Sequence, residues 1–226
     1  MHYSNIQQAI FLRRPNRFIA HIEIDGIEEV CHVKNTGRCK ELLTDRATIY
    51  VQHHDDDKRK TKYSLIAVEK GTLLINMDSQ APNKVVGEWI KEQEPFGEVK
   101  LLKPECKYGN SRFDFYLETA TDKMFIEVKG VTLEEEGIVR FPDAPTERGI
   151  KHLEELVACK KAGYKATVIF VVQMEGMHHF EPNYKTHPAF AEALKRAQAA
   201  GVEVFAYECC VTPDSLAIAK AIPVQL

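Results

Sequence analysis

The alternation of hydrophobic and polar residues divides the chain into two parts. Before residue 80, apolar and polar residues mostly alternate, which is the period of a strand with one buried face. Asp25-Gly26 is a typical hairpin turn, and a short helical turn is expected over residues 36–43. Strands are predicted over residues 18–24, 27–33, 47–52, 63–69 and 72–77. Five short strands favour a small closed barrel of the OB type.

The pattern changes after Pro82-Asn83, so we place a domain boundary there, between residues 1–83 and 84–226. Further strands are predicted over 98–102, 112–118, 124–130, 168–172 and 202–207, and helices over 84–93, from 143 or 146 to 163, and over 188–200. Strands that alternate with helices predict a sheet covered by helices. The fold class we expect is therefore a two-domain α+β and α/β chain, an OB-like barrel followed by an α/β domain.

Charged residues interrupt two strands of the second domain. Asp114 lies in one strand, and Glu127 and Lys129 lie in the next. Because side chains two apart in a strand share a face, Glu127 and Lys129 point the same way, while Ile126 and Val128 point to the core. The pattern therefore predicts a polar patch on one face of a sheet.

A hairpin loop expected over residues 119–123 places Asp114 almost opposite residues 127–129. Two carboxylates and one ammonium then share a patch. Carboxylate oxygens suit Mg²⁺ or Mn²⁺, and such an ion can activate water against a phosphodiester. Ordinary ion pairing on a solvated sheet face fits the same pattern, and the strands alone leave both interpretations open.

Three further residues are candidates for supporting roles. Glu105 precedes the strand of Asp114 and offers another carboxylate, although a surface position explains it equally well. Arg148 and His152 are four residues apart, so they share a helix face that could reach a phosphate, although taken alone they also fit an ordinary solvated face. Asp143 is explained by helix capping alone.

Basic residues cluster locally although the whole chain carries a net charge of −3. Residues 1–83 hold 12 Lys and Arg against 11 Asp and Glu, and residues 84–226 hold 18 against 22. A local basic surface can attract phosphate while the total stays acidic. The candidates for nucleic-acid contacts are Arg13, Arg14, Arg17, Arg38, Lys40 and Arg59.

Other features exclude several classes of protein. The six cysteines are scattered without a C-x-x-C pair, which argues against a zinc site. No stretch is apolar enough for a membrane span, and residues 1–8 lack the layout of a signal peptide, so a cytoplasmic protein is expected. Residues 134–136 are expected to form a solvated acidic loop. The oligomeric state stays open.

Several motifs resemble the sugar fermentation stimulation protein A family, and the resemblance covers nearly the whole chain. The motifs are Arg14-Pro15-Asn16-Arg17-Phe18, Asn35-Thr36-Gly37-Arg38, Glu41-Leu42-Leu43, Tyr108-Gly109-Asn110-Ser111-Arg112, Asp114-Phe115, residues 127–133 and residues 141–153. The chain departs from the pattern at Lys34, Cys39 and Thr186-His187-Pro188. These departures lie outside the acidic patch, so they bear mainly on local packing.

The resemblance implies an OB-like domain followed by a domain of the PD-(D/E)xK nuclease fold. It also implies DNA binding without sequence preference and a link to maltose metabolism. Asp114 resembles the metal-binding acid of the nuclease fold, Glu127 and Lys129 its E-x-K pair, and Glu105 its upstream acid.

Three functions fit these observations. The first is an Mg²⁺- or Mn²⁺-dependent nuclease, with Phe11, Phe18 or Tyr50 as stacking surfaces for bases. The second is a non-catalytic DNA-binding regulator linked to sugar metabolism, although no helix-turn-helix is evident. The third is a metal-dependent phosphatase or nucleotide hydrolase acting on small substrates, for which a separate OB-like domain has no evident use.

Overall fold

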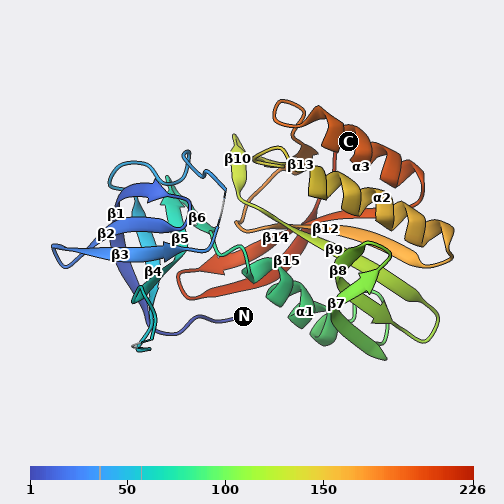
Figure 1. Cartoon of the computed structure of the whole chain (residues 1–226), viewed down its shortest axis with the longest axis horizontal. Coiled ribbons are helices and arrows are strands. Elements are labelled where there is room, and N and C mark those ends of the chain that lie inside the picture. Colours follow the sequence, from blue (N-terminus) through green and yellow to red (C-terminus); the bar gives the residue numbers. More distant parts are fainter. Residues whose placement is uncertain (36, 57) are drawn as a thin grey trace.

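The chain folds into two domains that lie side by side along its long axis (Figure 1). The computed structural model describes residues 1–35, 37–56 and 58–226. The first domain is a β-barrel, and the second is a sheet with helices on both faces. The expected two-domain fold class is therefore confirmed.

The barrel forms because each strand buries one face against the others. Its strands are β1 (Ile6–Asn16), β2 (Ile19–Ile24), β3 (Ile27–Val33), β4 (Thr48–His53), β5 (Tyr63–Lys70) and β6 (Leu73–Asn76), in the order β3-β2-β1-β4-β5-β6. A parallel pairing of β3 with β5 closes the barrel. The closed barrel confirms the expected OB-type domain.

Strand β1 was not predicted, because its polar residues mask the alternation. It carries adjacent glutamines and adjacent arginines, and its pairing with β2 is irregular around Arg13 and Asn16. The helical turn expected over residues 36–43 begins at Thr36, which lies outside the described residues. Within the described part of that segment, a single turn is closed by Leu43 N–H and the Cys39 carbonyl at 2.9 Å.

The second domain is built on six strands in the order β15-β14-β12-β9-β8-β7. They are β7 (Leu101–Tyr108), β8 (Ser111–Glu118), β9 (Lys123–Val131), β12 (Lys165–Val172), β14 (Glu203–Thr212) and β15 (Ser215–Ile222). Strand β12 pairs in parallel with β9 and β14, and the outer pairings are antiparallel. Strand β15 was not predicted.

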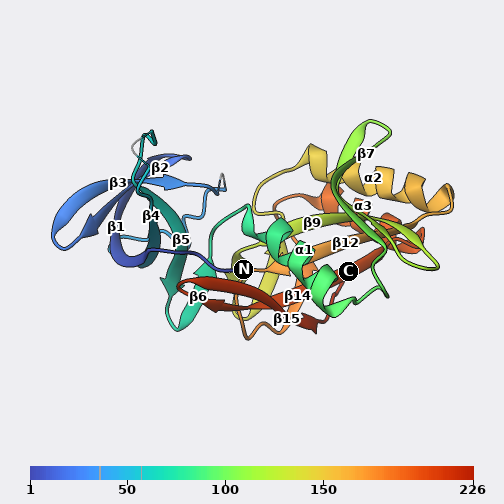
Figure 2. The ribbon, with the colours of Figure 1, turned by 90° about the horizontal axis from the view of Figure 1, so that it is seen from below.

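Helices cover both faces of this sheet (Figure 2). Helix α1 (Ala81–Gln93) packs on one face through Val85, Val86, Trp89 and Ile90, as its pattern predicted. Helices α2 (Glu147–Lys161) and α3 (Pro188–Ala199) pack on the other. Because α1 begins at Ala81, the boundary expected after residue 83 would fall within its first turn; that boundary stays a prediction.

The sequence left two candidates, Asp143 and Thr146, for the residue that caps the start of helix α2. Thr146 is the N-cap, and its side-chain oxygen accepts a hydrogen bond from Gly149 N–H at 3.0 Å. Such a bond satisfies one of the free N–H groups of the first turn. Asp143 therefore does not cap the helix and lies three residues before the N-cap.

A small third sheet joins the two domains, with the order β10-β11-β13. Its strands are β10 (Leu133–Glu135), β11 (Ile138–Phe141) and β13 (His179–Pro182). The expectation of a solvated loop at residues 134–136 is wrong for Glu134, which is buried and pairs with Lys70 of the barrel at 2.5 Å. A buried carboxylate keeps its charge when a cation pairs with it, so this contact links the domains.

None of the helices in the described ranges has both the length and the apolar composition needed to cross a lipid bilayer.

Replacement of Leu156 by alanine should lower the free energy of unfolding by about 2–5 kcal/mol, because Leu156 is fully buried between α2 and the sheet. The single tryptophan, Trp89, lies in the same domain and reports its unfolding in urea by fluorescence. Glu154→Ala, an exposed change on the same helix, should stay within about 0.5 kcal/mol. Equal urea midpoints for both variants would contradict the packing described.

Candidate active site

Strands β8 and β9 bring the predicted acidic residues together. The two strands pair antiparallel from Glu118 with Lys123 to Phe115 with Ile126. Beyond that pair, the Asp114 carboxylate accepts a hydrogen bond from Val128 N–H, with Oδ2 at 2.7 Å from the nitrogen. The side chain of Asp114 thus lies against the backbone of the neighbouring strand, opposite residues 127–129, where the expected hairpin places it.

The regular alternation of side chains along β8 is interrupted at Asp114. Phe113 packs in the core beneath α2 and α3, whereas Phe115 packs in the core beneath α1. Alternate residues of a regular strand share a face, so the strand turns over between these two residues. Asp114 consequently lies between the two layers, within reach of groups from both.

The side chain of Glu127 lies on the α2 side of the sheet, while Ile126 and Val128 pack beneath α1. It is only 3 % exposed. Its Oε1 accepts hydrogen bonds from Lys129 Nζ and from His152 Nδ1. Its Oε2 is buried and has no hydrogen-bond partner within the described part of the chain. A buried carboxylate oxygen without a partner is costly, by about 1–3 kcal/mol or more, which marks this atom as a place for a cation.

The pKa values of the two carboxyl groups move in opposite directions. Burial raises the pKa of Glu127, but the hydrogen bond from His152 and the charge of Lys129 outweigh it, and the net pKa lies below the ordinary value. Burial raises the pKa of Asp114, and the nearby negative charge of Glu127 raises it further. Hydrogen bonds from Val128 and Asn83 oppose this increase. Two like charges that lie close together behave in this way.

Asn83 is a member of the site that the sequence did not reveal. It lies in the first turn of α1, and its Nδ2 donates to Asp114 Oδ1 at 2.7 Å. A lone asparagine at the start of a helix carries no signal of such a contact, because the contact depends on how α1 crosses the sheet.

Arg148 and His152 share a face of α2, as their spacing predicted. Arg148 Nε donates to His152 Nε2 at 3.3 Å, and His152 Nδ1 donates to Glu127 Oε1. This pattern assigns the hydrogen of the imidazole to Nδ1. The ring of His152 is buried and stands edge-on to Phe113, with the ring centroids 6.1 Å apart. The side chains of Arg148, His152 and Glu127 therefore form a chain of contacts that runs from the surface to the buried carboxylate.

Glu105 occupies a different environment from Asp114 and Glu127. Its carboxylate is exposed and pairs with Arg112 at 3.2 Å. Its φ of 49° puts it in the left-handed region, which is unusual for a residue other than glycine. A contribution of Glu105 to the site stays a prediction.

The donor set suits a hard divalent ion. In the described ranges, no three His, Cys, Asp or Glu side chains gather closely enough to hold a metal ion by themselves. Mg²⁺ often binds through one or two carboxylates and keeps several waters. Asp114 and Glu127, with the unpartnered Oε2, fit that requirement.

The predicted nucleic-acid contacts fall into two groups. Arg14 is engaged inside the protein, because its guanidinium donates to the carbonyl groups of Arg17, Asn35, Gly37 and Arg38 at 2.7–2.9 Å. It therefore shapes the loop after β3. Arg13 pairs with Glu28 at 2.5 Å, and Arg59 donates to Thr61 and Ser64.

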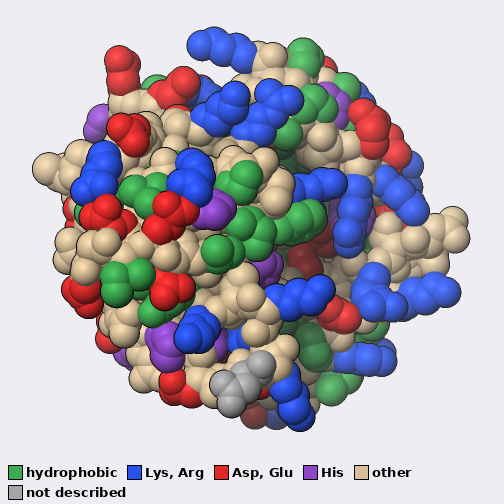
Figure 3. Space-filling model, turned by 60° about the vertical axis from the view of Figure 1, so that its left-hand side comes forward, with side chains coloured by type: hydrophobic (Ala, Val, Ile, Leu, Met, Phe, Trp, Pro, Cys, Tyr) green, Lys and Arg blue, Asp and Glu red, His purple; other side chains and the backbone are tan. Residues whose placement is uncertain are grey.

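The second group gathers around one pocket at the surface. Arg17, Arg38 and Lys40 are exposed and line a pocket of about 230 Å³ beside Arg14. Arg17 also lies over the ring of Phe18, 5.2 Å from its centroid. Lys and Arg side chains border a hollow on the face shown in Figure 3, with acidic side chains deeper inside. Positive charge is thus concentrated locally although the net charge is −3.

A cavity of about 110 Å³ lies where the domains meet, beside the end of β9. Gly130, which follows Lys129, lines it together with Asn35 of the barrel and Asp143. Gly37 packs so closely on Asp143 that an added Cβ would lie 2.3 Å from its carboxylate. The loop after β3 therefore approaches the strand that carries the acidic residues.

Comparisons with known proteins agree with this two-domain description. The family model of the sugar fermentation stimulation protein RE domain matches residues 80–215, and that of the SfsA N-terminal OB domain matches residues 12–77. The chain is 60 % identical to a sugar fermentation stimulation protein homolog of Clostridium beijerinckii, over 100 % of both chains. It is 55 % identical to the homolog of Ruminiclostridium cellulolyticum, again over 100 % of both.

A solved structure of Pyrococcus furiosus SfsA in complex with Ca²⁺ superimposes with a TM-score of 0.90 and 28 % sequence identity. The match covers 100 % of this chain and 98 % of that one. Both domains and their arrangement are therefore similar in the two proteins. On this evidence, the chain belongs to the sugar fermentation stimulation protein family.

Proposed function

We propose that this protein is a divalent-metal-dependent nuclease that hydrolyses phosphodiester bonds, with DNA as its substrate. The observation that carries the proposal is the pair of Asp114 and Glu127 at the centre of the sheet, with Glu127 Oε2 buried and unpartnered. A surface ion pair would not bury a carboxylate oxygen in this way, because burial without a partner is unfavourable. Lys129 completes the acid-and-lysine set expected of a nuclease.

Mg²⁺ or Mn²⁺ would be held by Asp114 and Glu127. When bound, such an ion supplies Lewis-acid chemistry, which stabilises charge on phosphate oxygens and makes water more acidic. The Ca²⁺ in the Pyrococcus furiosus structure supports a hard divalent ion in this family. The oxygen donors of the two carboxylates support the same choice.

The side chains around the carboxylates have distinct tasks in this proposal. Lys129 keeps its ammonium beside Glu127 with only 16 % of the side chain exposed. Because little water reaches this position, a positive charge here stabilises the negative charge that develops on a reacting phosphate. The stabilisation is stronger than it would be in water. His152 orients Glu127 through its hydrogen bond, and Arg148 orients His152. Arg148 is exposed, so it can also meet a phosphate of the substrate.

The barrel would bind the nucleic acid through its exposed cations and one aromatic ring. Arg17, Arg38 and Lys40 suit contacts with phosphates, since they face solvent. Phe18 is 48 % exposed, so its ring is available for stacking on a base. Phe11, by contrast, is buried in the barrel core, which removes it as a stacking surface. OB-type barrels commonly bind oligonucleotides in this manner.

The alternative is a DNA-binding regulator of sugar metabolism without catalytic activity. The names of the relatives, which refer to sugar fermentation, favour it. Under this alternative the barrel binds DNA as described, but the buried carboxylates have no chemical task. A cleavage assay separates the two.

Glu127→Gln should abolish metal-dependent cleavage, because an amide cannot serve as a charged ligand. The assay uses labelled single- and double-stranded DNA and RNA with Mg²⁺, Mn²⁺ or EDTA, and we expect a loss of at least about 100-fold. Glu154→Gln, an exposed change on α2, is the control and should keep full activity. Binding without cleavage, equal in the wild type and Glu127→Gln, would favour the regulator instead.

Simultaneous replacement of Arg17, Arg38 and Lys40 by alanine should weaken nucleic-acid binding and its dependence on salt. Each lost phosphate contact lowers the slope of log K against log salt by about 0.7–0.9, so three lost contacts should lower it by about 2–3. Fluorescence anisotropy at several salt concentrations measures this slope. Arg46→Ala removes an exposed cation that already pairs with Glu23 and should leave the slope almost unchanged. An unchanged slope in the triple variant would contradict this surface.

A further inference from the structure

Two hydrogen bonds, one to each oxygen, hold the Asp114 carboxylate in a single orientation. Val128 N–H donates to Oδ2 and Asn83 Nδ2 donates to Oδ1, each at 2.7 Å. The first donor belongs to β9 itself, whereas the second comes from α1 on a different layer. The orientation of Asp114 therefore depends on where the first turn of α1 lies.

An amide is well suited to this position. Asp114 and Glu127 repel each other when both are ionised, so Asp114 needs a donor that stabilises its charge. A lysine there would bring a positive charge that competes with a metal ion. The neutral amide of Asn83 donates one hydrogen bond and leaves the negative charge of the site available to a cation.

The first turn of α1 is held firmly against β9. A Cβ added to Gly130 would lie 2.9 Å from Pro82 Cγ and 2.6 Å from Gln173 Oε1. Only glycine fits there, because any side chain would displace one of these two residues. The backbone of β9 immediately after Lys129 thus contacts the residue before Asn83.

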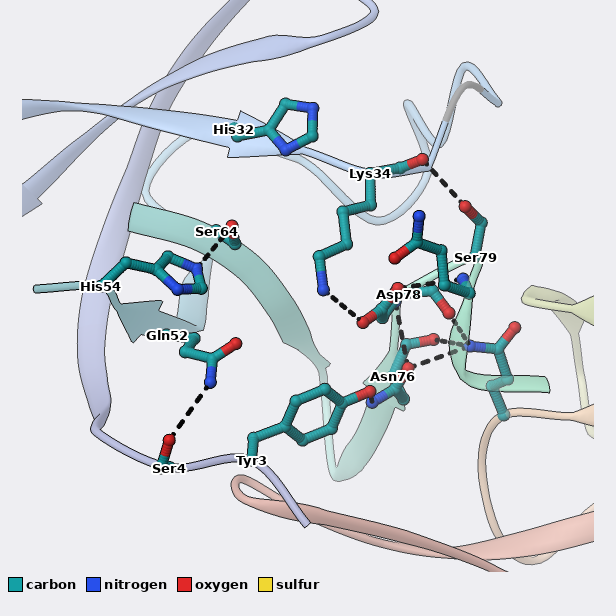
Figure 4. A network of polar contacts seen from close by, with 12 residues as sticks. Tyr3, Ser4, His32, Lys34, Gln52, His54, Ser64, Asn76, Asp78 and Ser79 are labelled. Carbon is teal, nitrogen blue, oxygen red and sulfur yellow. Dashed lines mark hydrogen bonds and ion pairs between the residues drawn. The ribbon is translucent and has the colours of Figure 1, made fainter. Parts of the chain in front are cut away.

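A buried polar network on the barrel side fixes the segment that leads into α1 (Figure 4). Gln173, at the end of β12, directs its amide nitrogen to the carbonyl and Oδ1 of Asn76 at 3.0 Å and to the carbonyl of Asp78 at 3.1 Å. Asp78 pairs with Lys34 at 2.7 Å, and Asn76 donates to the Tyr3 hydroxyl at 3.1 Å.

The exposed fraction of Gln173, Asn76 and Asp78 is 2 % or less. Buried networks whose members are satisfied keep a single geometry, since any shift leaves a polar group unpaired. Gln173 and Pro82 both lie against Gly130, so the network of Lys34 and Asp78 meets the first turn of α1 at this glycine.

We propose that Asn83 is a positioning residue of the metal centre, and that the network around Gln173 at the domain junction sets its place. Asn83 orients Asp114 toward the ion, and the junction holds Asn83 where it can do so. The inference rests on the proposed function, because it concerns the same metal centre. Its consequence is that changes at the domain junction alter metal affinity although they touch no ligand.

Asn83→Ala should weaken the binding of Mn²⁺ by about 10–100-fold, which is the usual effect of removing a hydrogen bond to a metal ligand. Isothermal titration calorimetry with Mn²⁺ alone measures this without reference to cleavage. Lys84→Ala, an exposed change at the next position of α1, should leave the affinity within about twofold. Asn83→Gln keeps an amide donor and should recover part of the affinity. In Asn83→Ala, cleavage should return as Mn²⁺ is raised, whereas in Asp114→Ala it should not.

The outcomes separate the two proposals. If Asp114→Ala loses Mn²⁺ binding and Asn83→Ala binds as the wild type does, the positioning role is wrong while the metal centre stands. If the wild type binds no Mn²⁺ and Asp114→Ala behaves identically, the proposed function fails, and the role of Asn83 fails with it.

The role of the junction is tested by Gln173→Met, which keeps the length of the side chain and removes its amide. We expect weaker Mn²⁺ binding than in the wild type, by up to about tenfold. The double variant with Asn83→Ala should be no weaker than Asn83→Ala alone by more than about twofold, since residues that act through one route are not additive.

Lys34→Met, which removes the cation paired with the buried Asp78 carboxylate, should act in the same direction as Gln173→Met. The fluorescence of Trp89 and the circular dichroism spectrum show whether each variant is folded. The role of the junction would be overturned if the losses in the double variant were additive. It would also be overturned if Gln173→Met and Lys34→Met bound Mn²⁺ as tightly as the wild type does.

Discussion

The burial of the Glu127 carboxylate is the constraint on which the organisation of the second domain depends. A carboxylate in the middle of a sheet loses its hydration, and it stays charged only if nearby groups replace that water. Lys129 on the same strand and His152 from α2 do so through one oxygen. Removing one partner of a buried charge typically costs about 3–5 kcal/mol, so α2 and β9 are held in a fixed relation. The second oxygen is buried and accepts no hydrogen bond from the residues that the structure describes.

The same constraint extends to the junction between the two domains. Asp114 faces Glu127 and needs donors of its own, and one of them comes from the helix that directly follows the domain junction. The junction is closed by buried polar contacts, including the pair of Lys70 with Glu134. Buried hydrogen bonds and ion pairs require one geometry, unlike apolar contacts that tolerate sliding. These contacts therefore fix the position of the barrel, with its exposed cations, relative to the acidic residues of the second domain.

Much of the fold could be predicted because strands and helices bury residues at characteristic periods. The alternation around Glu127 predicted β9, and the strand predicted over residues 168–172 lies within β12. Strand β1 escaped prediction, because its buried residues are interrupted by glutamines and arginines that satisfy no simple period. The residues of β10, β11 and β13 were missed for a related reason. These strands are three or four residues long, and the sheet is completed by the pairing of β11 with β13, which is distant in the chain, so their stability comes from the surrounding structure.

The sequence by itself determined the two-domain organisation, the position of Asp114 opposite the strand of Glu127 and Lys129, and the shared face of Arg148 and His152. Each of these follows from spacing within a single strand, hairpin or helix. Only the tertiary structure decided that Asn83 reaches Asp114, that Arg14 is engaged by backbone carbonyls, and that Glu134 is buried at the domain junction. These contacts join residues far apart in the chain. Their formation depends on how layers and domains pack, which local periodicity does not encode.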